Sequence, residues 1–81
     1  MREYPYSIIK SVDRINNMTD PIIINGVTVH HIDQLGFKEY DNEYVVMSLL
    51  NQSKEVASVK IYSYQKLVIN ESNNSYMIMS S

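Results

Sequence analysis

The only cluster of residue types that ligate metals in this sequence is His30-His31-Ile32-Asp33. Successive side chains of a β-strand point to opposite faces, so His30 and His31 cannot bind one ion together in an extended segment. His31 and Asp33 would share a face and could supply two ligands. A metal site needs a third and a fourth ligand, and the sequence marks no candidate for either. We therefore expect no metal site.

Three carboxylates, Glu39, Asp41 and Glu43, alternate around a predicted turn. Paired carboxyl groups can do acid–base chemistry when their surroundings differ. At the tip of a hairpin, water surrounds all of them and removes such a difference. The pattern therefore favours a solvated acidic tip, which could contact a basic partner.

Nucleophilic and phosphate chemistry have little support in the sequence. The chain has no cysteine, which excludes disulfides and thiolate zinc sites. It has no Gly-x-Ser-x-Gly elbow, and its two glycines cannot build a glycine-rich phosphate loop. The sequence predicts a protein that is not an enzyme and that uses no cofactor.

A second candidate surface lies in the run Lys-Ile-Tyr-Ser-Tyr-Gln-Lys at residues 60–66. In one continuous strand, Lys60, Tyr62, Tyr64 and Lys66 would lie on the same face. Tyrosines between cations are typical of sheets that stack single-stranded nucleic acid, and tyrosine is also enriched at protein interfaces. The net charge of −2 and the thinly spread lysines favour a protein partner over nucleic acid.

The elements that must position these residues are predicted to be mainly strands. Ten isoleucines, eight valines and seven tyrosines stand against one alanine and four leucines. Such a composition is typical of pleated, half-buried surfaces and argues against an all-helical fold. Residues 7–17 are the exception, because Ile8, Val12 and Ile15 recur at helical spacing. A bent strand remains the alternative for this segment.

The clearest local signal is a hairpin. Asn25-Gly26 separates residues 22–24 from residues 27–29, and Asn-Gly is the preferred type I′ turn because both positions need positive φ. We expect residues 30–32 to extend its second strand. The other predicted segments are a turn or a single helical turn at 33–36, a hairpin of 37–40 and 43–50 around Asp41-Asn42, polar loops at 51–54 and 70–74, a long β-prone segment at 56–69 that bends or splits near 63–65, and a last strand at 76–79.

These segments predict a single domain spanning residues 1–81, β-rich α+β in class. The architecture would be a small antiparallel sheet or an open SH3-like or OB-like barrel of about five to six short strands, with one short N-terminal helix possible. A chain of this size buries a small core, which favours self-association as a homodimer. The apolar segment 76–79 is the expected seam, because an uncovered edge strand of that kind would invite aggregation.

Composition also bears on location and origin. No apolar run is long enough to span a membrane, and the first residues lack the apolar core of a secretory signal, so a cytoplasmic protein is expected. Residues with AT-rich codons, such as isoleucine and asparagine, far outnumber alanine and glycine. This bias suggests a low-GC bacterium or one of its phages or mobile elements.

The sequence therefore favours a small inhibitor or regulator that occludes the surface of a host or phage protein. One alternative is a nucleic-acid-binding small barrel that uses the face carrying Lys60 and Lys66. Another is a structural or assembly component, or an oligomer that sequesters a ligand.

Overall fold

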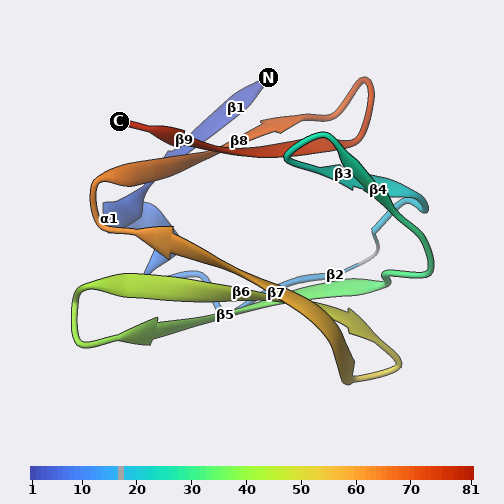
Figure 1. Ribbon diagram of the computed structural model, residues 1–81, viewed down its shortest axis with the longest axis horizontal. Helices are drawn as coiled ribbons and strands as arrows, with labels where there is room; N and C mark the ends of the chain where they lie inside the picture. Colours follow the sequence, from blue (N-terminus) through green and yellow to red (C-terminus); the bar gives the residue numbers. More distant parts are fainter. Residues whose placement is uncertain (17) are drawn as a thin grey trace.

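Buried and exposed side chains alternate along the central strands of this protein, so one row of residues on each of these strands faces the space between two β-sheets. The computed structural model of the protein describes residues 1–16 and 18–81, and Figure 1 shows the sheets as an upper and a lower layer. In chain order the elements are β1 (Arg2–Pro5), α1 (Tyr6–Ile9), β2 (Arg14–Asn16), β3 (Ile22–Ile24), β4 (Val27–Val29), β5 (Gln34–Tyr40), β6 (Tyr44–Asn51), β7 (Lys54–Tyr62), β8 (Gln65–Asn70) and β9 (Ser75–Ser80).

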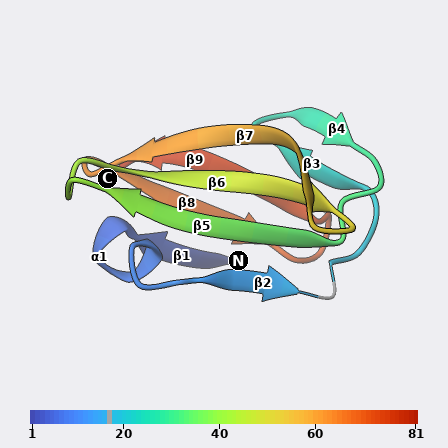
Figure 2. The same cartoon turned by 90° about the horizontal axis from the view of Figure 1, so that it is seen from below.

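The upper layer is a five-stranded sheet in the order β1-β8-β9-β3-β4, and the lower layer is a four-stranded sheet in the order β2-β5-β6-β7. The four-stranded sheet is antiparallel, and its strands β5, β6 and β7 follow one another in the chain (Figure 2). The five-stranded sheet joins distant segments: β1 pairs with β8, and β3 runs parallel to β9. The β-rich class predicted from the sequence is confirmed. Over the described residues the two sheets form a sandwich and do not close into a barrel.

The core lies between the sheets. Along β6 the inward residues Val45, Met47 and Leu49 are buried, whereas Tyr44, Val46 and Ser48 on the outer face are half-buried. The short helix α1 contributes Ile9 and covers one end of the sandwich, at the left in Figure 1. No helix among the described residues is long and apolar enough to span a membrane.

Two predicted turns are present in the structure, and in both the turn residues adopt the positive φ that the turn needs. Asn25 and Gly26 have φ of 47° and 83°, and the flanking strands β3 and β4 pair antiparallel. Asp41 and Asn42 likewise have φ of 53°, and they connect β5 to β6. These positive values suit asparagine, aspartate and glycine. Both predicted hairpins are confirmed.

The helix predicted at residues 7–17 is wrong over most of its length, and Asn17 lies outside the described residues. Only one turn, α1, is helical. Arg14–Asn16 instead forms β2, where Ile15 pairs with Leu35 of β5. The β-branched residues of this segment favour an extended backbone wherever a neighbouring strand is available.

Two other local predictions are wrong. The second hairpin strand does not continue through residues 30–32, because β4 ends at Val29 and His31 turns the chain with φ of 64°. Residues 33–36 do not form a turn, because Gln34 begins the long strand β5. Pairing with β2 and β6 on both sides stabilises this extended backbone despite its turn-like composition.

The C-terminal segment is not an edge strand. Residues 76–79 lie in β9, between β8 and β3 in the five-stranded sheet. Tyr76 pairs with Ile69 on one side and with Ile24 on the other. Strand β8 pairs with residues 76–79 along one side, whereas on the other side β3 reaches only Tyr76 and the Asn25 side chain accepts from the amide of Ile78. The predicted seam is therefore covered in part by the same chain, and self-association stays a prediction.

Candidate functional site

The long segment predicted to bend or split near residues 63–65 is split, and its two parts lie in different sheets. Strand β7 ends at Tyr62, Ser63 and Tyr64 form a turn, and β8 begins at Gln65 in the opposite sheet. Lys66 therefore lies on the five-stranded sheet, where its Nζ donates a hydrogen bond to Glu3 Oε1 at 2.7 Å. The prediction that Lys66 shares a face with Lys60 and Tyr62 is wrong, because the turn carries the chain from one sheet to the other.

A row of tyrosines replaces the predicted face. Tyr40, Tyr44 and Tyr62 lie directly opposite one another on β5, β6 and β7. Their ring centroids are 5.4 Å apart for Tyr40–Tyr44 and 5.8 Å apart for Tyr44–Tyr62. Tyr64, from the turn after β7, stacks on Tyr62 at 5.7 Å. We call these four residues the tyrosine ladder.

The ladder lies on the outer face of the four-stranded sheet. Tyr44 is half-buried, whereas the next residue, Val45, is fully buried in the core. Alternation along a strand then assigns Tyr44, and with it the whole row, to the solvent face. The two end rings are the most accessible members, with 37% of Tyr40 and 64% of Tyr64 exposed.

Two lysines flank the ladder in the next row of the same face. The Nζ of Lys60 lies 4.6 Å from the ring centroid of Tyr44, and the Nζ of Lys38 lies 5.4 Å from that of Tyr40. Val46 of β6 lies between the two lysines, paired with Lys38 of β5 on one side and with Lys60 of β7 on the other. An ammonium over a tyrosine ring at these distances contributes about 0.5–1 kcal/mol at an exposed site. The contacts orient the rings and place positive charge beside them.

Backbone contacts hold the two turns at the ladder's end together. The amide of Ser63 donates to the carbonyl of Glu43 at 3.0 Å, and the amide of Ser81 donates to the carbonyl of Tyr64 at 3.0 Å. The amide of Tyr62 donates to Oε1 of Gln65 at 2.8 Å. The exposed ring of Tyr64 is therefore carried by a turn that is anchored on both sides.

The three predicted acidic residues do not act as one group. Asp41 and Glu43 are exposed on the turn beside the ladder, as the solvated-tip prediction has it. Glu39 faces the opposite side of the sheet, where its Oε2 accepts a long hydrogen bond of 3.4 Å from the hydroxyl of Tyr6. Burial, and then the nearby Glu39 carboxylate, raise the pKa of Tyr6. The arrangement keeps Tyr6 neutral and separates Glu39 from Asp41 and Glu43.

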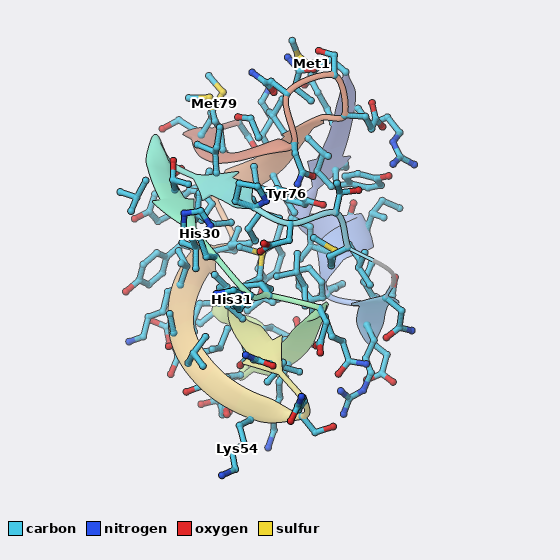
Figure 3. The ribbon with its side chains drawn as sticks, turned by 90° about the vertical axis from the view of Figure 1, so that its right-hand side faces the viewer. Met1, His30, His31, Lys54, Tyr76 and Met79 are labelled. Carbon is cyan, nitrogen blue, oxygen red and sulfur yellow. The ribbon has the colours of Figure 1, made fainter. Side chains whose placement is uncertain are left out.

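The histidine cluster lies in the loop between β4 and β5 (Figure 3). The backbone amide of His31 donates to the side chain of Asp20, and Oδ2 of Asp33 accepts from the amide of Gln52 at 3.1 Å. Both carboxylates therefore hold loops in place. The described part of the chain brings together no three histidine, aspartate or glutamate side chains that could hold a metal ion.

An apolar cavity of about 170 Å³ lies beside α1, between the sheets. Every lining side chain is apolar or aromatic: Tyr4, Ile9, Val12, Ile15, Phe37 and Leu67.

Sequence reasoning found Lys60, Tyr62 and Tyr64 but missed Tyr40, Tyr44 and Lys38. One signal for the missed tyrosines was present, because Tyr40 and Tyr44 flank the correctly predicted Asp41-Asn42 turn at equal distance. Their alignment with Tyr62 depends on the register between β6 and β7, which no local pattern specifies.

Comparison of the chain with protein-family models, with curated proteins and with solved structures finds no match. The functional argument therefore starts from the tyrosine ladder and its surroundings.

Proposed function

We propose that this protein is a protein-binding module that occludes a partner through the tyrosine ladder, as a small inhibitor or regulator would. The observation that carries the proposal is the ladder itself, four aligned tyrosines on a sheet face with two lysines beside them. Tyrosine supplies a large amphipathic contact area at low entropic cost and is enriched at interfaces. The small size of the chain and its excess of residues with AT-rich codons support a regulator encoded by a phage or another mobile element.

The stacking geometry favours a protein over single-stranded nucleic acid. Nucleic-acid platforms offer free aromatic faces to the bases. Here Tyr40 and Tyr44 stack on each other with an interplanar angle of 20°, and Tyr62 and Tyr64 do so at 11°. Lys60 lies over Tyr44. The stacked faces are covered within the ladder, and the exposed parts of its rings combine apolar carbon with hydroxyl groups, which suits the mixed polar and apolar surface of a protein.

The charge around the ladder suits a partner with an acidic rim. Lys38 and Lys60 lie on one side of the row, and Asp41 and Glu43 lie on the turn beside its other side. A surface with both signs in fixed places selects the orientation of a partner more than it raises affinity. The net charge of −2 gives no general attraction to phosphates.

The test compares two double variants with the wild-type protein as baits in a native lysate, with quantitative mass spectrometry of the captured proteins. Tyr40→Ala/Tyr64→Ala removes the two most exposed rings and leaves the half-buried Tyr44 and Tyr62 in place. Each aromatic anchor contributes about 2 kcal/mol at an interface, so we expect capture of the partner to fall at least about thirtyfold. Circular dichroism should stay native.

Met77→Ala/Met79→Ala is the matched control. It removes two side chains of similar exposure, 45% and 44%, from the other sheet. The control should capture the same partner as the wild type. Equal capture by the tyrosine variant would contradict the proposal. So would salt-sensitive binding of an oligonucleotide that the tyrosine variant loses.

A further inference from the structure

Strand β7 is the outer strand of the four-stranded sheet, and within the described residues one of its two edges has no neighbouring strand. It is also the longest strand, nine residues from Lys54 to Tyr62. In Figure 3 it runs along the margin of the molecule, and Lys54 at its beginning projects away from the body. A long edge strand offers a row of backbone groups to another chain.

Hydrogen bonds at the end of β7 determine which backbone groups face outward. The amide of Ser63 donates to the carbonyl of Glu43, so that pair is hydrogen-bonded. In an antiparallel ladder the pairs alternate, so Tyr62 opposite Tyr44 must point its N–H and C=O away from β6. The bond from the Tyr62 amide to Gln65 agrees with this assignment. By the same alternation, the backbone N–H and C=O groups of Lys60 and Ser58, two and four residues before Tyr62, also point away from β6.

Within residues 1–16 and 18–81, the chain covers only the Tyr62 end of this edge. Gln65 takes the outward amide of Tyr62, and the ring of Tyr64 stacks beside that of Tyr62. Among the described residues, no hydrogen bond from another element reaches the outward backbone groups of Ser58 and Lys60. The middle of β7 is therefore the open part of the edge.

The side chains around Ser58 are self-complementary. Lys60 lies on the outer face of the sheet, over Tyr44. Glu55 shares that face, because its Oε1 accepts a hydrogen bond of 2.6 Å from Ser48, whose side chain is in the row of Ser58. A bulge opposite Leu49 and Leu50 inserts one extra residue into β7. On the outer face of the sheet, Lys60 is therefore the next side chain after Ser58 in one direction, and Glu55 is the next in the other direction.

We propose that β7 pairs antiparallel with β7 of a second copy of this chain, about a two-fold axis at Ser58. Ser58 then exchanges two backbone hydrogen bonds with the partner's Ser58. Lys60 lies across from the partner's Glu55, and the symmetry repeats that ion pair. The two four-stranded sheets become one continuous sheet, with both tyrosine ladders on the same face. The pairing does not depend on what the tyrosine ladder binds.

Sedimentation equilibrium over about a hundredfold concentration range tests the pairing by mass action. The wild-type mass should rise from 9.4 kDa toward twice that value. Ser58→Pro removes the central outward N–H, and proline is tolerated where an edge N–H faces solvent. This variant should stay at 9.4 kDa with native circular dichroism. A wild type that stays monomeric, or a folded Ser58→Pro variant that still dimerises, would overturn the proposal.

A charge exchange gives a second test that does not alter the backbone. Lys60→Glu and Glu55→Lys each place like charges opposite one another and should weaken the dimer about tenfold or more. The double variant restores opposite charges and should return the dissociation constant to within about threefold of wild type. Lys38→Glu, on the same face but two strands from the edge, is the control and should leave the dimer intact. Failure of the double variant to restore association would overturn the assigned register.

Discussion

Gly26 and Gly36, the two glycines of the chain, have different backbone roles. Gly26 has φ of 83° in the β3–β4 turn, and no atom lies within 4 Å of where its Cβ would be. The cost of a side chain there comes from the backbone alone. We expect Gly26→Val to destabilise the protein by roughly 1–3 kcal/mol, because a β-branched residue is forced to positive φ. Thermal or urea unfolding measures the change.

Gly36 provides the matched comparison, because it lies in β5 without positive φ. A Cβ at Gly36 would lie 3.5 Å from Cδ1 of Leu50, an ordinary contact. Gly36→Ala should therefore be neutral or stabilise the protein by up to about 1 kcal/mol. A Gly26→Val variant as stable as Gly36→Ala would contradict the type I′ turn.

Asn25 has a second role that its turn signature did not indicate. Its amide donates to the carbonyl of Tyr76 at 2.9 Å, and its Oδ1 accepts from the amide of Ile78 at 2.9 Å. The side chain of Asn25 thus accepts a hydrogen bond from β9 at a position beyond the end of β3, where no backbone group of β3 is available. Asn25→Gly keeps the positive φ and removes only the bond to Ile78. We expect a loss of about 1 kcal/mol and faster amide exchange at Ile78. Unchanged exchange there would contradict the role.

At the scale of elements, β1 is attached partly through charge. Lys66 of β8 donates to Glu3 of β1, and this hydrogen bond and the nearby positive charge lower the pKa of Glu3 below its usual 4.5. A lowered carboxyl pKa adds stability above the unfolded-state value, and that stability is lost as the pH falls through the folded-state value. We therefore expect acid below about pH 4.5 to loosen β1 from β8.

Glu3→Gln and Lys66→Gln test this attachment. Each should flatten the fall in melting temperature between about pH 5 and pH 3, and the double variant should flatten it no further, because both changes remove one interaction. The effect should be small, since Glu3 is exposed to solvent. An additive effect in the double variant would show that the two side chains act separately.

Elements whose partners are adjacent in the chain were predictable, and elements with distant partners were not. The turns at Asn25-Gly26 and Asp41-Asn42 follow from residues that tolerate positive φ, so the hairpins around them follow as well. Strand β2 was predicted only through the alternative of a bent strand, because Ile15 also fits a helical spacing and only its pairing with Leu35 of β5 distinguishes the two. No local pattern encodes that partner.

The residues of the candidate site also fall into a group that was predictable from one segment and a group that depends on distant partners. Tyr62 and Tyr64 were found because their spacing is visible within one segment. Lys66 was included wrongly, because a two-residue turn between sheets has no feature that distinguishes it from a bend within one strand. Tyr40 and Tyr44 joined the site only through the register of β5, β6 and β7. Cross-strand register is a property of the folded sheet.

At the scale of the whole molecule, the two sheets have different proposed roles. The outer face of the four-stranded sheet carries the tyrosine ladder and the open edge of β7, so both proposed contacts involve one layer. The five-stranded sheet covers the core from the other side with residues such as Ile22, Leu67 and Tyr76. If the β7 pairing forms, each dimer presents two ladders, and a partner with two matching sites would bind far more tightly than one ladder allows.

The pairing of β1 with β8 also has a consequence for the order in which the chain folds. Arg2 pairs with Ile69 and Pro5 with Lys66, so the five-stranded sheet is assembled from residues far apart in the sequence. The hairpins of β5, β6 and β7 close over short loops and can form while the chain is still being synthesised. Until β8 and β9 emerge from the ribosome, the inward row of Val45, Met47 and Leu49 lacks the two strands that join β1 to β3 in the covering sheet. The nascent chain therefore presents a flat apolar face at the stage when chaperones or aggregation compete for it.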